Sequence, residues 1–233
     1  MSTQHVSRIL CATEPRGAGP ALDRLLEIAE QREVHAIALV GDLGGESDAE
    51  TYRDLFRTLA RADRPTYWVP GPGDAPVGTY LREAQNMEVV FPFLHGVHGT
   101  AAFASEHVVV AGLGGEVSDD PDAIRDEVQR LRYPRWEPEY RLKLVRELGE
   151  HQLVLLFWTP PAHKGLGTPG SEALAELVAT HRPRLVVCGG ERGTELLGRS
   201  LIVAPGQLRD GHCAVADLHS RTAELEELPA AIT

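Results

Sequence analysis

The sequence has few cysteines and lysines and no long hydrophobic segment. Only three of its 233 residues are cysteines, and they show no C-x-x-C spacing. Cys11, Cys188 and Cys213 lie within or beside apolar runs, so we expect buried free thiols in a reducing compartment. No apolar run reaches the roughly 18 residues that span a bilayer, and the N-terminus lacks a signal-peptide pattern. These absences predict a cytoplasmic protein without a membrane contact.

Basic residues are the minority among the charged ones. The 23 Lys and Arg residues face 34 Asp and Glu residues, which gives a formal net charge of −11. A uniformly acidic body repels phosphates, so we expect no nucleic-acid polymer as a partner. A small basic pocket within the acidic body stays compatible with this charge. The hydrophobic fraction of 42% is ordinary for a globular chain of this length, which suffices for one sizeable core.

The first third of the chain alternates between strand and helix patterns. Apolar runs at residues 6–12, 35–40 and 66–69 predict strands, and the middle one has the continuous apolar character of a strand buried on both faces. Apolar residues at helical spacing predict helices at residues 20–32 and from Ser47 onward. This alternation indicates a sheet of parallel strands covered by helices.

The remainder of the chain is richer in strands. Residues 101–104 and 107–111 predict a hairpin, and residues 152–157 and 185–188 predict buried strands separated by a helix at 171–180. Residues 119–149 are charged and helical in character, and we interpret them as an insertion. We expect one domain over residues 1–233 with two sheets.

Several polar side chains come directly after predicted strands, where ligands gather in open α/β sheets. They are Glu14, Asp42, Asp74, Trp158 and the pair Glu191-Arg192. This ordered set resembles the calcineurin-like metallophosphoesterase superfamily, and in particular its small bacterial members without an assigned substrate. The resemblance extends from about Arg8 to Leu218. It implies a four-layer α/β/β/α sandwich of two mixed sheets flanked by helices.

The resemblance also implies a site for two divalent cations, which family members hold with carboxylate, imidazole and amide ligands. The first family motif, D-x-H, falls on Glu14-Pro15-Arg16, and the bridging aspartate of the family falls on Asp42. The G-N-H-D/E motif falls on Gly71-Pro72-Gly73-Asp74, which lacks both the amide ligand and the histidine. Only Glu14 and Asp42 therefore keep a carboxylate at a ligand position.

The later motifs have lost their imidazoles as well. Trp158 stands where the family has a histidine, and the G-H-x-H pair falls on Gly189-Gly190-Glu191-Arg192. Arginine has no lone pair to donate to a metal. We expect no resident cofactor or metal; if a weakly held Mg²⁺ or Mn²⁺ binds at all, Glu14 and Asp42 are its ligands.

Arg16 and Arg192 have two interpretations at these positions. They either neutralise the neighbouring acids in a structural ion-pair cluster or hold an anionic small molecule through guanidinium hydrogen bonds. Four further residues are candidates for the same pocket: Glu116 as an additional carboxylate, Trp158 as a stacking platform or cavity filler, and His163 and Lys164 as anion contacts. Asp42 and His163 are the candidate catalytic residues.

Three functions remain open from the sequence. The first is a pseudoenzyme that binds a phosphate-bearing or other anionic small molecule. The second is an active phosphoesterase with a rebuilt metal site that uses Glu14, Asp42, Asp74, Glu116 and His163. The third is an assembly module, a homo-oligomer that uses the aromatic and arginine side chains of residues 132–136.

Overall fold

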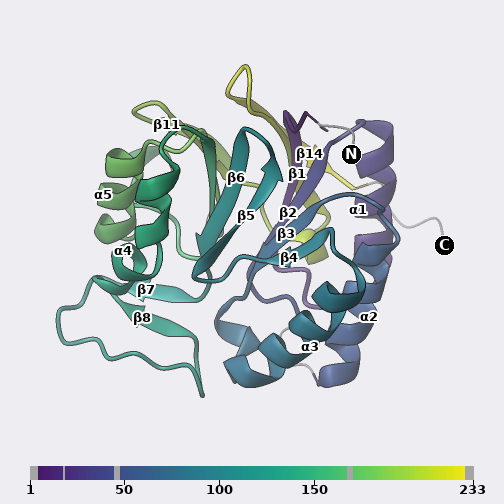
Figure 1. Ribbon diagram of the computed structural model, residues 1–233, viewed down its shortest axis with the longest axis horizontal. Helices are drawn as coiled ribbons and strands as arrows, with labels where there is room; N and C mark the ends of the chain where they lie inside the picture. The colour runs from purple at the N-terminus through teal and green to yellow at the C-terminus, as the bar shows by residue number, and fades with distance from the viewer. Residues whose placement is uncertain (1–4, 18, 45–47, 167–169, 229–233) are drawn as a thin grey trace.

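Two six-stranded sheets pack face to face, with helices on both outer faces (Figure 1). This computed structural model describes residues 5–17, 19–44, 48–166 and 170–228. The predicted four-layer arrangement of two mixed sheets is confirmed. Within the described residues, no helix combines the length and the apolar character that crossing a bilayer requires.

The first sheet has the order β14-β13-β1-β2-β3-β4, in which β1 to β4 are parallel and β13 and β14 are antiparallel additions at one edge. Along β1 the side chains alternate, with Ile9 and Cys11 between the two sheets and Leu10 toward the helices. The strands are β1 (Arg8–Thr13), β2 (Ala36–Val40), β3 (Thr66–Val69), β4 (Leu94–Gly96), β13 (His212–Asp217) and β14 (Thr222–Glu227).

The second sheet has the order β11-β12-β10-β9-β6-β5, with four parallel central strands and an antiparallel strand at each edge. The predicted hairpin is present as β5 and β6. The strands are β5 (Thr100–Ser105), β6 (Val108–Leu113), β9 (Gln152–Phe157), β10 (Leu185–Cys188), β11 (Gly193–Leu197) and β12 (Ser200–Ala204).

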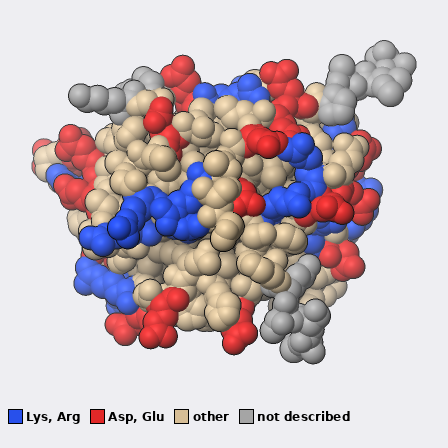
Figure 2. All heavy atoms as spheres, turned by 90° about the horizontal axis from the view of Figure 1, so that it is seen from above, with Lys and Arg blue, Asp and Glu red and all other residues tan. Residues whose placement is uncertain are grey.

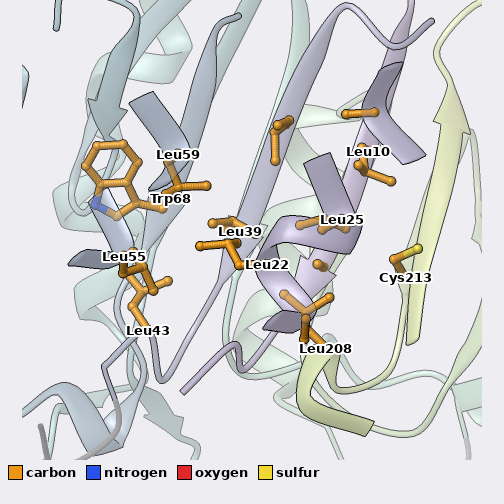
Figure 3. Packing of buried hydrophobic residues seen from close by; sticks show 14 of the residues in the cluster. Leu10, Leu22, Leu25, Leu39, Leu43, Leu55, Leu59, Trp68, Leu208 and Cys213 are labelled. Carbon is orange, nitrogen blue, oxygen red and sulfur yellow. The ribbon is translucent and has the colours of Figure 1, made fainter. Parts of the chain in front are cut away.

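The helices divide between the two outer faces (Figure 1). On the first sheet, Leu22 and Leu25 of the N-terminal helix α1 pack on Leu10 and Leu39 of the strands (Figure 3). The helices here are α1 (Gly19–Gln31), α2 (Ala49–Ala60) and α3 (Val77–Val90); those on the second sheet are α4 (Glu137–Arg141) and α5 (Glu172–His181). The short 3-10 helices are η1 (Pro72–Asp74), η2 (Lys143–Leu148), η3 (Lys164–Leu166) and η4 (Leu208–Asp210).

Helix α2 begins at a different cap from the predicted one. The predicted N-cap, Ser47, lies outside the described residues, and Asp48 caps α2 by accepting the N–H groups of Glu50 and Thr51. All three cysteines are buried and unpaired, as expected.

The segment 119–149 differs from its predicted helical character. It contains only α4 and η2 as helices, together with β8 (Arg132–Pro134), which pairs with β7 (Glu116–Ser118). The Asp126 carboxylate accepts the backbone N–H groups of Val128 and Gln129, and such local bonds compete with helix formation. The helical pattern of this stretch came from its charges rather than from an apolar stripe, which is why it misled the prediction. Helix α3, which buries Tyr80, was not predicted.

Candidate functional site

The loops that follow β1, β2 and β3 lie together at one edge of the first sheet, because the carboxyl ends of parallel strands share an edge. Glu14 follows β1 directly, and Asp42 comes two residues after the end of β2. The first two loops are joined by backbone hydrogen bonds, from Arg16 N–H to Asp42 O at 3.0 Å and from Gly17 N–H to Leu43 O at 2.8 Å. The structure therefore brings together the two carboxylates that the sequence singled out.

Three residues of these loops other than glycine have left-handed backbone conformations. Their φ angles are 48° at Glu14, 46° at Arg16 and 43° at Asp42. Such conformations cost a residue other than glycine on the order of 1–3 kcal/mol each, and they cluster at functional sites. The loops thus hold a strained geometry at the strand ends where the side chains converge.

Arg16 bridges the two carboxylates. Its Nη2 atom donates hydrogen bonds to Glu14 Oε2 at 3.0 Å and to Asp42 Oδ2 at 2.8 Å. The other oxygen of Asp42, Oδ1, accepts the backbone N–H of Gly73 at 2.8 Å. The carboxylates are buried, with 10% and 5% of their side-chain surface exposed, whereas the Arg16 side chain is 40% exposed.

The ion pairs also set the protonation state of Arg16. Burial works to lower the pKa of this guanidinium, but the hydrogen bond to Glu14 and the charges of Asp42, Glu14 and Asp74 outweigh it and raise the pKa. The side chain is therefore always a cation, and it has no lone pair for a metal.

Asp74 is buried, and its carboxylate accepts hydrogen bonds mainly from backbone N–H groups. Its carboxylate accepts N–H groups from Leu43 at 2.9 Å, Gly44 at 3.0 Å and Gly71 at 2.7 Å, and the hydroxyl of Tyr52 at 2.8 Å. Burial raises the pKa of Asp74, and these hydrogen bonds oppose that rise. The residue joins the loops after β2 and β3, and its lone pairs are already engaged.

Trp158 reaches the same edge from the second sheet. Its indole ring lies against the backbone of Gly41, where an added Cβ would come within 1.9 Å of the Trp158 Cδ1 atom. The indole Nε1 is buried and has no hydrogen-bond partner among the described residues. The ring therefore lies against the residue that precedes Asp42 in the chain.

A cavity of about 460 Å³ opens beside Trp158. Glu116, Arg130 and Gly190 line it together with Trp158. The Glu116 carboxylate pairs with Arg130 at 2.8 Å and with Arg132 at 3.2 Å, so it is already compensated by two guanidinium groups. Of the predicted site residues, Glu116 and Trp158 thus line one cavity, to which Glu14, Arg16 and Asp42 do not contribute.

The other predicted site residues make their contacts elsewhere. Arg192 donates to the carbonyl of Glu226 at 3.2 Å and lies 3.5 Å from the Glu227 carboxylate, both in β14. His163 accepts the N–H of Gly165 at 3.2 Å through Nδ1, and Glu191 is exposed. Lys164 belongs to η3, and its side chain lies outside the described part of the structure.

The donor set does not fit the paired metal ions of the family. A guanidinium nitrogen lies within hydrogen-bond distance of both surviving carboxylates, and no imidazole accompanies them among the described residues. Across the described ranges, no three His, Cys, Asp or Glu residues form a group that could hold a metal ion. No reaction step can be derived through such ions from these residues.

Two parts of the site escaped the sequence analysis. Tyr52 lies in the helix expected from Ser47 onward and was not a predicted site residue, although its hydroxyl donates a hydrogen bond to Asp74. Arg130 had no signal at all, because it comes from the irregular segment that precedes β8. Gly71 is the residue whose type reflects the site in the sequence, because an added Cβ there would lie 2.1 Å from Asp42 Oδ1 and only glycine leaves room.

Known structures share this fold. The chain is 41% identical to TT1561 of Thermus thermophilus, with a TM-score of 0.91 over 96% of this chain and 100% of the other. A dimetal phosphatase from Danio rerio matches at a TM-score of 0.61 and 10% identity, over 95% of this chain and 96% of the other. A novel archaeal phosphodiesterase matches at 0.53 and 9% identity, over 95% and 99%. The last two likenesses show the fold alone.

Sequence comparison identifies the family. No curated protein sequence matches the chain significantly. Residues 45–228 match the family model described as metallophosphoesterase, calcineurin superfamily, which is most of the chain. The resemblance predicted from the strand-end motifs is confirmed, and the chain belongs to the calcineurin superfamily of metallophosphoesterases.

Proposed function

We propose that this chain is a metallophosphoesterase-family pseudoenzyme in which Arg16 replaces the family's metal ions, and that it binds a phosphate-bearing or other anionic small molecule at the Arg16 cluster. The observation that carries the proposal is the double hydrogen bond from Arg16 Nη2 to Glu14 and Asp42. A divalent cation that bridged these carboxylates would have to displace a permanently charged side chain.

The exposure of Arg16 and a cavity lined by Trp158 are the arguments for an anionic ligand. The side chain is 40% exposed, so part of the guanidinium faces solvent, and guanidinium groups bind phosphate with directed hydrogen bonds. Trp158, whose ring lies against Gly41 beside Asp42 in the chain, lines a cavity of about 460 Å³, which has the size of a small-molecule site, about 300–1,000 Å³. The ring of Trp158 lines this cavity and offers a flat surface to such a molecule.

Metal analysis and ligand titration test the proposal together. Protein purified without chelator should contain far less than one Mn, Fe or Zn ion per chain. Calorimetric titration with a panel of phosphate esters should find a ligand whose affinity drops at least tenfold in Arg16→Gln. The matched control is Arg57→Gln, which removes an arginine that is 65% exposed on α2.

Two results would overturn the proposal. One is a near-stoichiometric transition metal in the purified protein. The other is a panel of phosphate esters that binds Arg16→Gln as tightly as the unchanged protein.

A second candidate function is a phosphoesterase with one weakly held Mg²⁺ or Mn²⁺ at Glu14 and Asp42. It is favoured by the charge of the cluster, since two carboxylates face one guanidinium. A screen of phosphomonoesters and phosphodiesters with added Mn²⁺ would detect turnover that Asp42→Asn abolishes. Equal turnover by Asp42→Asn and the unchanged protein would exclude this site as the source of activity.

A further inference from the structure

A second and larger cavity, of about 650 Å³, lies at the other end of the second sheet. Gln152, the first residue of β9, lines it, whereas Trp158 at the Arg16 cluster follows the last residue of the same strand. Six residues of strand span about 20 Å, so the two cavities are separated by roughly the length of β9. A ligand in this cavity would not contact Arg16.

Arginine dominates the walls of this cavity, to which no Asp or Glu of the described residues contributes. The side chains come from four separate parts of the chain: η2, the loop between α5 and β10, the β11–β12 turn and the β13–β14 turn. They are Arg146, Arg182, Arg184, Arg199 and Arg221. Figure 2 shows the molecule from above the view of Figure 1. A band of basic side chains crosses the half of the visible face that lies over α4 and α5.

Most of these charges lack an acidic partner. Arg146 pairs with Glu139, but in the part of the chain that the structure describes, no carboxylate pairs with the other four. Arg184 donates instead to the carbonyl oxygens of Leu218 and His219. Elsewhere the arginines of this acidic protein are commonly paired, as Arg141 is with Glu127.

The unpaired charges repel one another. Burial lowers the pKa of Arg184, and the charge of Arg221 lowers it further, while Asp217 acts in the opposite direction. The pKa of His181 in the same wall is lowered by burial and by Arg146. Two buried polar atoms of the wall, Arg221 Nε and His151 Nδ1, also have no hydrogen-bond partner among the described residues. This concentration of like charge is electrostatically costly.

We propose that this cavity is a second binding site, and that its ligand is a small molecule with two or more linked phosphate groups. One phosphate can engage only a few guanidinium groups, so several unpaired arginines around one cavity match a chain of phosphates. The volume suits a molecule the size of a nucleotide, and Val145, Leu153 and Pro183 provide apolar wall for a ring.

Calorimetric titration of the full chain with tripolyphosphate, ADP and inorganic phosphate tests this site. We expect tripolyphosphate and ADP to bind at least tenfold more tightly than inorganic phosphate, with affinity that falls as salt increases. The double variant Arg182→Glu/Arg199→Glu changes two exposed side chains of the wall and should weaken tripolyphosphate at least tenfold. The control Arg57→Glu/Arg61→Glu makes the same charge change at side chains 65% and 62% exposed at α2 and its C-terminal end.

A second readout locates the bound phosphates. Tripolyphosphate next to Arg146 should raise the pKa of His181, measured by NMR titration of its imidazole, and this change should be absent in Arg182→Glu/Arg199→Glu. Arg16→Gln should leave both the tripolyphosphate affinity of this cavity and the His181 response unchanged, which separates this proposal from the proposed function.

Three results would overturn the inference. They are an unchanged tripolyphosphate affinity in a folded Arg182→Glu/Arg199→Glu variant, equal affinity for inorganic phosphate, and tighter binding of a short single-stranded DNA than of tripolyphosphate at the same salt concentration. The last result would identify the arginine cavity as a nucleic-acid surface.

Discussion

Arg16 and Gly71 shape the end of the first sheet from opposite sides of Asp42. Arg16 holds one carboxylate oxygen, and the backbone after β3 approaches so closely that only glycine fits at position 71. Two different constraints therefore fix one side chain, which explains how a strained backbone at Asp42 persists.

The close approach makes Gly71→Ala a sensitive test of this geometry. An added Cβ would lie 2.1 Å from Asp42 Oδ1 and 2.2 Å from Asp42 N, so the loops must move apart. We expect a loss of about 3 kcal/mol in the free energy of unfolding, at the upper end of the usual cost of overpacking. Urea denaturation measures this loss.

Gly78→Ala is the control for this substitution. No atom lies within 4 Å of a Cβ at position 78, which belongs to helix α3, so stability should stay equal or rise by about 0.5–1 kcal/mol. Equal stabilities of Gly71→Ala and the unchanged protein would contradict the tight packing around Asp42.

At the scale of the elements, His98 connects the β5–β6 hairpin with the segment 119–149 through hydrogen bonds. The residue lies between β4 and β5, and its Nδ1 accepts the N–H of Gly114 at 3.0 Å. Its Nε2 is 3.0 Å from the hydroxyl of Tyr133, which donates to Glu127 at 2.9 Å, and Arg141 also holds that carboxylate. The imidazole is neutral in this network, because Nδ1 must accept a hydrogen bond.

This network predicts a loss of stability in mild acid. Burial, followed by the charge of Arg141, lowers the pKa of His98 to about 4, against the opposing charge of Glu127. The unfolded chain therefore takes up a proton at a higher pH than the folded protein. The contribution of neutral His98 to the free energy of unfolding is complete above about pH 6.5, and about 3 kcal/mol of it is lost as the pH falls from there to 4.

Urea denaturation at pH 7 and pH 5 measures this effect. His98→Gln should be less stable than the unchanged protein at pH 7, and the difference between the two should shrink at pH 5. A difference that stays the same at both pH values would show that His98 does not remain neutral in the folded protein.

At the scale of the whole molecule, an acidic body carries an arginine-lined cavity and an exposed aromatic pair. Trp136 and Tyr140 are 60% and 61% exposed, and their rings contact edge to face at a centroid distance of 6.1 Å. Aromatic and arginine side chains are enriched where proteins associate. This surface continues the predicted assembly segment, in which Tyr133 turned out to be buried.

The exposed pair predicts a homo-oligomer. If a second copy covers Trp136, sedimentation velocity should show a species larger than one chain that Trp136→Ala dissociates. Leu196→Ala, which alters a side chain 57% exposed on β11, is the control. A single chain at all concentrations would count against self-association.

The sequence by itself determined several strands and the chemistry available at the strand ends. Apolar runs specify strands through near neighbours alone, so β3, β9 and β10 have the predicted bounds. The replacement of histidine by Arg16 and Trp158 is likewise visible in the chain. These features need no knowledge of how distant segments meet.

Only the tertiary structure decided how those side chains are used. Arg16 turns back between two carboxylates, whereas Arg192, with the same chemistry, reaches β14. The arginine cavity combines segments that are up to 75 residues apart, from Arg146 to Arg221, and no local pattern marks it. Such contacts depend on the path of the backbone through distant loops, and that path is fixed by the packing of the two sheets.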